Sequence, residues 1–279
     1  YRLPKDFPSL VYLTQLLQAE AVRTGVEYWR RNRDCTSGTL YWQLNDCWPV
    51  ASWASLDYFG RWKALHYMAK RFYAPLLLSA EEEQADAASD ATTHQTGYLF
   101  QPKPGPYMKL NLTSDLVEAW AGTVRWSLES IRGEVIKAGQ TNVSVGATSA
   151  ATVCVLDFDA EVNRDNEREV ILVYELMQDD QRLSMGIFAF VPSKHLSLID
   201  PELTWRVISM NGDVFIELTA NTLARYICLS LADADIVFED NFFDLPAGRT
   251  VRVKMSIPSA WSVADVEARL SVLSLVDSY

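Results

Sequence analysis

The stretch from Gly38 to Lys63 constrains the fold most strongly, because it places a short apolar run and four tryptophans between two amphipathic patterns. The run Thr39–Leu44 is apolar on both faces apart from Gln43. Such a run is typical of a strand that helices cover on both sides, as in a parallel sheet. The sequence therefore predicts a short buried strand here, followed by a loop of about fifteen residues.

Amphipathic helices are predicted on both sides of this strand, over residues 8 to about 33 and about 61 to 72. In each, apolar side chains recur at spacings of three and four, which puts them on one face of a helix. The predicted inward positions are Leu10, Leu13, Leu17 and Ala21 in the first helix and Trp62, Leu65, Ala69 and Phe72 in the second. Helix, buried strand, long loop and helix form the rhythm of an α/β barrel, and one such unit cannot close a barrel alone. We expect the remaining barrel strands to precede Tyr1.

From about Ala74 the pattern changes from helical to period two. The acidic run Glu81–Asp90 predicts an exposed loop, and apolar residues alternate with others in several short runs after it. These runs contain Leu110, Val124, Val153, Ile171 and Phe188, with turn signals at Gly133, Gly139 and Gly146. Short alternating strands with turns between them indicate a β-sandwich over residues 76–193.

A second β-sandwich is predicted over residues 194–279, after a joint at Pro192–Ser197. Its clearest signal is Asn211-Gly212 between two alternating runs, because Asn-Gly is the strongest short hairpin signal. Further strands are predicted at Ala224–Leu231, Val251–Ile257 and Ala268–Val276.

The net charge of the chain limits the kinds of molecule that it can bind. A formal net charge of −11 at pH 7 argues against nucleic acid, anionic membranes and strongly anionic substrates, because phosphate binding needs a basic surface. No apolar run reaches the roughly 18 residues that span a bilayer. The four cysteines and three histidines show no spacing typical of a disulfide framework or a zinc site. We therefore expect a neutral substrate and neither a metal nor a cofactor.

The tryptophans and the polar residues beside them are the candidate site. Trp42, Asn45 and Asp46 end the predicted strand, and Trp48 and Trp53 lie in the loop after it. Aromatic faces beside amides and carboxylates suit a sugar, whose C–H faces stack on rings while its hydroxyls need hydrogen-bond partners. The tryptophans can also be core residues, and Asn45 and Asp46 can tie the backbone of the loop itself.

Three stretches of the sequence resemble one family of enzymes. The motif Trp42-Gln-Leu-Asn-Asp-Cys-Trp-Pro49, within residues 36–67, closely resembles the last strand, loop and helix of the catalytic barrel in β-mannosidases of glycoside hydrolase family 2. The resemblance extends to Pro4-Lys-Asp-Phe7 and to Ala69-Lys-Arg-Phe-Tyr-Ala-Pro75. The run Phe238-Glu-Asp-Asn-Phe-Phe-Asp-Leu-Pro-Ala-Gly248 is similar to the signature of that family's C-terminal immunoglobulin-like domain. The resemblance implies the end of a (β/α)8 TIM barrel over residues 1–75, followed by two immunoglobulin-like β-sandwiches.

The resemblance also implies an activity, namely exo-acting, retaining hydrolysis of terminal non-reducing β-D-mannose residues from β-mannosides and manno-oligosaccharides. One glutamate attacks the anomeric carbon, and a second protonates the leaving oxygen and then activates water. In the family both lie on earlier barrel strands. Glu20 and Glu27 fall on the first predicted helix, and no glutamate ends a predicted barrel strand here. We expect the catalytic pair in the N-terminal portion of the same enzyme, and the chain alone to be inactive.

The resemblance gives the tryptophan motif a binding role. Trp42 is implied to form the floor under the mannosyl ring, and the Trp42–Gln43 peptide bond is expected to be cis, as in related barrel glycosidases. Asn45, Asp46 and Trp48 complete the implied substrate-binding set, and no cofactor is implied.

Two other functions fit parts of the sequence. One is a non-catalytic carbohydrate-binding or structural β-sandwich module with a helical leader, although a binding module would carry its aromatic residues on a sandwich face. The other is a different family 2 specificity, such as that of a β-glucosaminidase. The sequons Asn111-Leu-Thr113 and Asn142-Val-Ser144 are possible glycosylation sites and favour a secreted or lysosome- or vacuole-like location over the cytoplasm.

Overall fold

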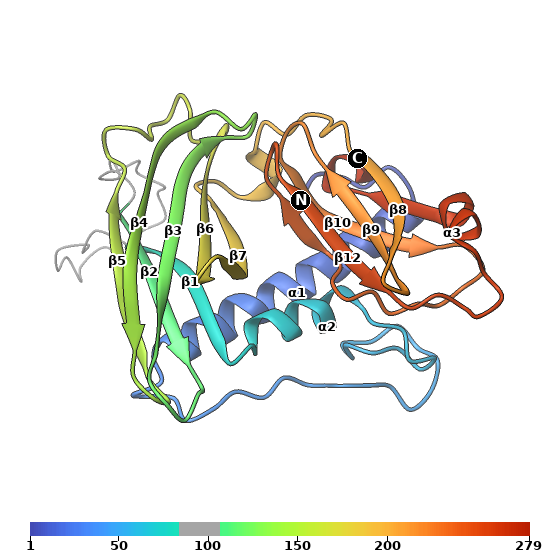
Figure 1. The fold of residues 1–279 in the computed structure, drawn as a ribbon, viewed down its shortest axis with the longest axis horizontal. Coiled ribbons are helices and arrows are strands. Elements are labelled where there is room, and N and C mark those ends of the chain that lie inside the picture. The colour runs from blue at the N-terminus through green and yellow to red at the C-terminus, as the bar shows by residue number, and fades with distance from the viewer. Residues whose placement is uncertain (84–106) are drawn as a thin grey trace, which may run out of the picture.

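Two paired helices and two β-sandwiches make up the computed structural model, which describes residues 1–83 and 107–279. Helix α1 (Phe7–Arg31) runs beneath both sandwiches, and α2 (Ala64–Phe72) lies along it, as Figure 1 shows. The carboxylate of Asp6 accepts a hydrogen bond of 2.8 Å from the backbone N–H of Ser9 and so caps the first turn of α1. Both helices form where the sequence predicts them.

The buried face of α1 differs from the predicted one. Its buried apolar residues are Tyr12, Leu13, Leu16, Ala19 and Val26, which pack on α2 and on the second sandwich. Of the predicted inward positions, Leu13 is confirmed, whereas Leu10 and Leu17 are 43% and 61% exposed and Ala21 is also exposed, so these three were wrong. The predicted positions Leu65, Ala69 and Phe72 of α2 are buried. Which face of α1 is buried depends on the elements that pack against the helix. The spacing of apolar residues in the sequence does not identify those elements.

The predicted strand at Thr39–Leu44 is absent from the structure, in which residues 36–63 form a long extended connection between α1 and α2 (Figure 1). A strand needs neighbours to accept and donate its backbone hydrogen bonds. Within the described residues, this stretch takes part only in isolated bridges, at Asn45–Leu56 and Leu56–Trp62.

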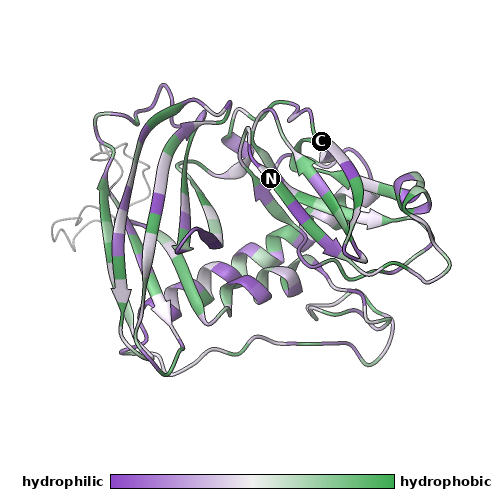
Figure 2. Ribbon diagram, in the orientation of Figure 1, coloured by the Kyte–Doolittle hydropathy of each residue, from purple (hydrophilic) through white to green (hydrophobic). Residues whose placement is uncertain are grey.

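The first β-sandwich packs the antiparallel sheet β1-β2-β5 on the antiparallel sheet β4-β3-β6-β7. The strands are β1 (Leu76–Glu83), β2 (Tyr107–Ser114), β3 (Trp120–Ser130), β4 (Val135–Val145), β5 (Ala150–Asp157), β6 (Val170–Gln178) and β7 (Gln181–Ala189). Leu110, Leu128 and Leu172 are fully buried between the sheets. Figure 2 shows the alternation of hydrophobic and hydrophilic residues along these strands that the period-two pattern predicted.

Two details of the first sandwich correct the sequence analysis. Glu81–Glu83 belong to β1 rather than to a loop, and the rest of the predicted acidic loop lies outside the described residues. Gly139 lies inside β4 opposite Trp126, not in a turn. A Cβ atom at Gly139 would approach the Trp126 ring to 2.6 Å, so the glycine makes room for the indole.

The second β-sandwich contains the antiparallel sheets β12-β9-β8 and β11-β10-β13. Its strands are β8 (Thr204–Met210), β9 (Asp213–Thr219), β10 (Ala224–Leu231), β11 (Phe243–Leu245), β12 (Thr250–Met255) and β13 (Leu270–Leu273). The predicted hairpin is confirmed, because Asn211 and Gly212 have φ angles of 55° and 86° and join β8 to β9. The short helix η1 (Ser193–His195) lies at the predicted joint between the sandwiches.

The last predicted strand, Ala268–Val276, is shorter than expected. Helix α3 (Val263–Arg269) precedes β13, and the short helix η2 (Leu275–Ser278) follows it. Ser262 and Asp265 form a capping box in which each side chain bonds the other's backbone N–H. This local hydrogen bonding stabilises the helix at the expense of the strand.

The two sandwiches meet in a small interface between their sheets. The backbone N–H of Leu223 donates a hydrogen bond of 2.7 Å to Ile131 O, and both residues are buried in one apolar cluster. Beside it, the guanidinium of Arg249 binds both carboxylate oxygens of Glu129, at 2.8 and 2.6 Å. Glu129 is only 2% exposed, so its carboxylate is shielded from solvent in this ion pair at the interface.

No helix within the described ranges is long and apolar enough to cross a membrane.

Replacement of Arg249 by alanine is expected to lower the free energy of unfolding by about 2–3 kcal/mol, because it leaves the Glu129 carboxylate buried without its partner. Urea denaturation followed by tryptophan fluorescence measures the change. Arg252→Ala is the matched control, because Arg252 pairs with Glu217 on an exposed sheet face and should matter much less. Equal effects of the two substitutions would show that the interface does not depend on the buried pair.

Candidate functional site

The tryptophan segment, defined here as residues 36–63, leaves the end of α1 and returns to the start of α2 (Figure 1). Its outgoing and returning parts are joined by two backbone hydrogen bonds, from the N–H of Ser55 to Gln43 O at 3.0 Å and from the N–H of Leu56 to Leu44 O at 2.8 Å. Residues 43–45 and 55–57 therefore lie side by side, and the loop between them carries Asp46, Trp48 and Trp53.

Ser55 fixes this pairing from the inside. Its side chain is fully buried, and its hydroxyl donates a hydrogen bond of 3.0 Å to Leu44 O. Oγ of Ser55 also lies 2.8 Å from the Tyr41 hydroxyl and 3.0 Å from Nδ1 of His66. One serine thus links both arms of the segment to α2. Its spacing in the sequence gave no signal for this role.

Asp46 holds the loop between the two arms. It is 8% exposed, and its two carboxylate oxygens share the single hydroxyl proton of Ser52, whose oxygen lies 2.7 Å from each. Nζ of Lys63 lies 3.9 Å from the same carboxylate. The Ser52 hydroxyl also accepts a hydrogen bond of 3.1 Å from the N–H of Ala54. Of the two interpretations open for Asp46, the structure supports the one in which it orients the loop.

The other predicted site residues lie on the outside of the loop. Trp42 and Trp48 are 76% and 62% exposed, and Trp53 is similarly open. Asn45 is exposed, and its amide donates a hydrogen bond of 3.3 Å to Asp46 O. The Trp42–Gln43 peptide bond is cis, as expected from the resemblance. The structure therefore leaves Trp42, Asn45 and Trp48 exposed within the tryptophan segment and buries Asp46.

The returning part of the segment is tied to α1 and is also held by hydrogen bonds of its own. The amide of Gln18 on α1 donates a hydrogen bond of 2.6 Å to Trp53 O. Asp57 accepts hydrogen bonds from the N–H groups of Phe59 and Arg61, both at 2.9 Å, and from Nε of Arg61. Partial burial would raise the pKa of Asp57, but the hydrogen bonds from Arg61 and Phe59 hold this pKa below its usual value. These contacts fix an otherwise irregular segment.

The described residues show no acidic or metal-binding centre. In residues 1–83 and 107–279, no group of three or more His, Cys, Asp or Glu side chains is placed to hold a metal ion. Glu20 and Glu27 lie on α1 and pair with Arg23, so they do not reach the tryptophan segment as a carboxylate pair.

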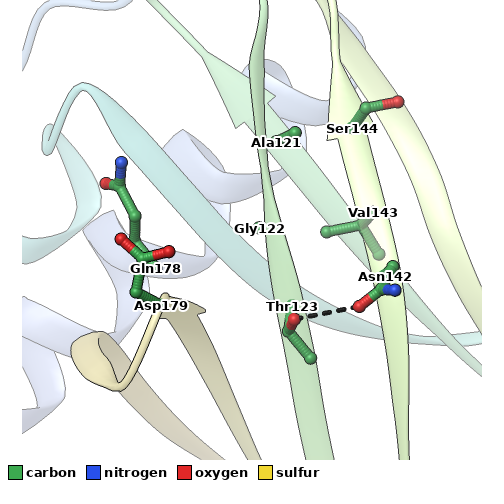
Figure 3. A pocket seen from close by; sticks show the side chains of 8 residues that line it. All are labelled: Ala121, Gly122, Thr123, Asn142, Val143, Ser144, Gln178 and Asp179. Atoms are coloured by element: carbon green, nitrogen blue, oxygen red, sulfur yellow. Dashed lines mark hydrogen bonds between the residues drawn. The ribbon is translucent and has the colours of Figure 1, made fainter.

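The two predicted glycosylation sites differ in how exposed their asparagine side chains are to solvent. Asn111 is 6% exposed within β2, where its side-chain oxygen accepts a hydrogen bond of 2.8 Å from Thr152. A glycan needs a free amide nitrogen at the surface, so the prediction for Asn111 does not fit the structure. Asn142 is exposed on β4, beside a shallow depression of about 530 Å³ in which Thr123 donates a hydrogen bond of 3.1 Å to its side-chain oxygen (Figure 3).

Two family models match the sandwich part of the chain. Residues 108–195 match the Mannosidase Ig/CBM-like domain, and residues 198–278 match the Ig-fold domain. Both β-sandwiches are therefore immunoglobulin-like.

Curated relatives match almost the whole chain. The β-mannosidases of Mus musculus and Bos taurus are each 30% identical to it and align with 99% of it, and β-mannosidase B of Aspergillus niger is 30% identical over 91% of it. The chain spans about 30% of the length of these relatives.

Solved structures share the fold. The crystal structure of a β-D-mannosidase from Dictyoglomus thermophilum matches 98% of the chain, and 30% of its own chain, with a TM-score of 0.78 at 23% identity. An exo-chitosanase from Amycolatopsis orientalis matches 95% of the chain, and 33% of its own chain, with a TM-score of 0.64 at 17% identity.

His66 should make the segment sensitive to pH. Its ring packs edge-on against Trp62 with centroids 4.3 Å apart, and burial lowers its pKa below the ordinary value of 6.5. The unfolded state then binds a proton at His66 more readily than the folded state. The contribution of the neutral His66 ring to the free energy of unfolding is therefore complete above pH 6.5 and is lost as the pH falls below that value. His66→Gln should flatten this fall, measured by denaturation at several pH values between about 8 and 5.

The control for this experiment is His195→Gln, which removes an exposed imidazole far from the segment in sequence. An unchanged pH dependence in His66→Gln, or an equal change in both variants, would contradict the role given to His66.

Proposed function

Because the chain belongs to the β-mannosidase family, we propose that it is part of an exo-acting, retaining β-mannosidase. The enzyme removes terminal non-reducing β-D-mannose residues from β-mannosides and manno-oligosaccharides. The observation that carries the proposal is the extent of the match to the mammalian relatives, which leaves out about 1% of the chain and so includes the tryptophan segment. A module related only through its sandwiches would not match there.

Residues 1–75 are proposed to be the C-terminal end of a (β/α)8 barrel, followed by immunoglobulin-like domains over residues 76–193 and 194–279. The support is the apolar surface that the segment and α1 leave open. Leu40 is 99% exposed, and Leu44 and Leu17 are more than half exposed. Large apolar side chains left this open offer a surface that another part of the protein can cover. The proposed partner is the N-terminal portion of the same enzyme, with the neighbouring barrel strands.

The residues proposed to form the substrate-binding site are Trp42, Asn45, Asp46 and Trp48. The exposed indole of Trp42 offers a flat apolar face on which the C–H groups of a mannosyl ring stack. The Asn45 amide lies beside it to bond sugar hydroxyls, and Trp48 forms a side of the pocket. Asp46 acts indirectly, since its bonds to Ser52 fix the loop that carries the other three.

The bond-breaking chemistry is proposed to come from outside this chain. Two glutamates of the N-terminal portion act as nucleophile and acid/base, with carboxyl groups about 5–5.5 Å apart as retention requires. This chemistry needs no cofactor. The chain supplies the stacking surface and its support, and is inactive by itself.

The enzyme is proposed to work in a secreted or lysosome- or vacuole-like compartment. The support is the exposed Asn142 in an Asn-Val-Ser sequon, which the secretory pathway can glycosylate.

Trp42→Ala in the full-length enzyme should lower kcat/KM for p-nitrophenyl β-mannoside by roughly ten- to a thousandfold, because it removes a stacking surface worth about 1.5–4 kcal/mol. Release of p-nitrophenol measures the rate. Trp42→Phe, which keeps a smaller aromatic ring, should lower kcat/KM by a smaller factor than Trp42→Ala.

The matched control is Trp205→Ala, which removes a partly exposed indole from β8 in the second sandwich. An unchanged kcat/KM in Trp42→Ala would overturn the stacking role. Hydrolysis of the β-glucosaminide but not of the β-mannoside would overturn the proposed specificity in favour of a β-glucosaminidase.

Glycosylation can be tested separately by expression in a eukaryotic host. An endoglycosidase should lower the mass of the wild-type protein and of Asn111→Gln, whose amide is buried. In the Asn142→Gln variant, peptide mass spectrometry should detect no glycosylated peptide from residues 1–279. An unmodified Asn142 peptide in the wild type would remove the support for the proposed compartment.

A further inference from the structure

We propose that a pocket at the C-terminal end of α1 binds one sugar unit of a neutral β-mannan chain, through residues other than those of the proposed substrate-binding site. The pocket has a volume of about 240 Å³ and lies where the end of α1, the start of the tryptophan segment, the end of α2 and β2 meet. Trp29, Arg33, Ser37, Thr39, Tyr73 and Asp115 are among its lining residues. Neither Trp42 nor Trp48 belongs to the lining.

Two aromatic rings in the lining are held in place yet open. Trp29 is 43% exposed, and its ring lies over Gly25, where even a Cβ atom would come within 3.4 Å of it. The ring of Tyr73 stacks on Tyr41 with centroids 6.4 Å apart, and its hydroxyl lies 3.0 Å from Oγ1 of Thr39. Rings fixed before a ligand arrives lose little conformational entropy on binding. Such rings suit the apolar face of a sugar.

The polar groups of the pocket are held by hydrogen bonds, and one carboxylate partly offsets two guanidinium charges. The Asp115 carboxylate accepts hydrogen bonds from Arg30 at 2.8 Å and from Arg33 at 2.9 Å. About half of its side-chain surface remains exposed, at 49%. Carboxylate oxygens, guanidinium N–H groups and the hydroxyls of Ser37 and Thr39 together offer both acceptors and donors, as sugar hydroxyls require. Arg30 also donates to Phe72 O and Ala74 O, so it is not free to attract an anion.

The size and charge of the pocket limit its ligand. A volume of about 240 Å³ lies just below the range of about 300–1,000 Å³ for drug-sized ligands, so it accommodates one sugar ring with the rest of the chain outside. The Asp115 carboxylate offsets guanidinium charge, and the whole chain carries −11, so a neutral ligand is favoured. That the sugar is mannose rests on the proposed function. Holding the polymer beside an exo-acting enzyme would raise the local concentration of chain ends.

The test is native electrophoresis of the full-length enzyme in gels containing soluble galactomannan, compared with gels without polysaccharide. The wild type should migrate more slowly in galactomannan. Trp29→Ala should raise the apparent dissociation constant at least about tenfold, equivalent to ~1.4 kcal/mol. Trp42→Ala should still be retarded, because Trp42 does not line the pocket, and Trp205→Ala is the matched control for loss of an indole.

A second variant blocks the pocket without removing a ring. A side chain at Gly38 meets nothing within 4 Å of its Cβ atom, so Gly38→Phe should fold normally while its ring fills the pocket. It should abolish retardation as Trp29→Ala does, with thermal unfolding confirming that both variants are folded. Unchanged retardation in both variants would overturn the proposal.

Other outcomes separate this proposal from the proposed function. A wild type that hydrolyses p-nitrophenyl β-mannoside but shows no retardation refutes the second binding site and leaves the activity standing. A wild type with Trp29-dependent retardation but no hydrolysis supports the site and refutes the activity. Retardation confined to gels with sulfated dextran would show an anion site at Arg33 and overturn the proposal for a neutral sugar.

Discussion

The buried guanidinium of Arg30 is the point at which three parts of the molecule meet. It donates hydrogen bonds of 2.6 and 2.9 Å to Phe72 O and Ala74 O at the end of α2, and one of 2.8 Å to Asp115 next to the first sandwich. One side chain of α1 thus satisfies carbonyl groups that the end of α2 leaves unpaired. Both ends of the tryptophan segment start from these helices, so Arg30 fixes the span that the segment must cover.

The second sandwich holds α2 from its other side. Arg71 donates hydrogen bonds of 3.0 and 2.9 Å to Asn241 O and Phe242 O and pairs with Asp240, and the Tyr67 hydroxyl accepts one of 3.2 Å from the N–H of Phe238. The first part of the run that the resemblance marked as a signature, Phe238–Phe242, therefore packs against α2. Both sandwiches position the helix pair, and the helix pair positions the loop that carries Trp42 and Asp46.

This arrangement explains why so much aromatic surface is open. The buried residues of α1 face α2 and the second sandwich, whereas Leu17, Trp42 and Trp48 are each more than 60% exposed. Asp46, Ser52 and Ser55 bury their polar groups inside the loop and keep it in shape without a hydrophobic core of its own. Polar contacts thus set the backbone and leave the indoles free for a ligand or for neighbouring strands.

The sequence by itself determined what depends on local spacing: the two helices, the alternating strands, the Asn211-Gly212 hairpin and the residues of the exposed loop. It also determined the family, since the motif Trp42–Pro49 is a continuous run of residues. Only the tertiary structure decided which face of α1 is buried, that Thr39–Leu44 forms no strand, and that Asn111 is inaccessible. It also showed that Asp46 bonds Ser52 inside the loop and that Trp29 and Tyr73 line one pocket. These features depend on partners far away in the chain, such as Tyr226 for α1 or Thr152 for Asn111, and no local pattern encodes a distant partner.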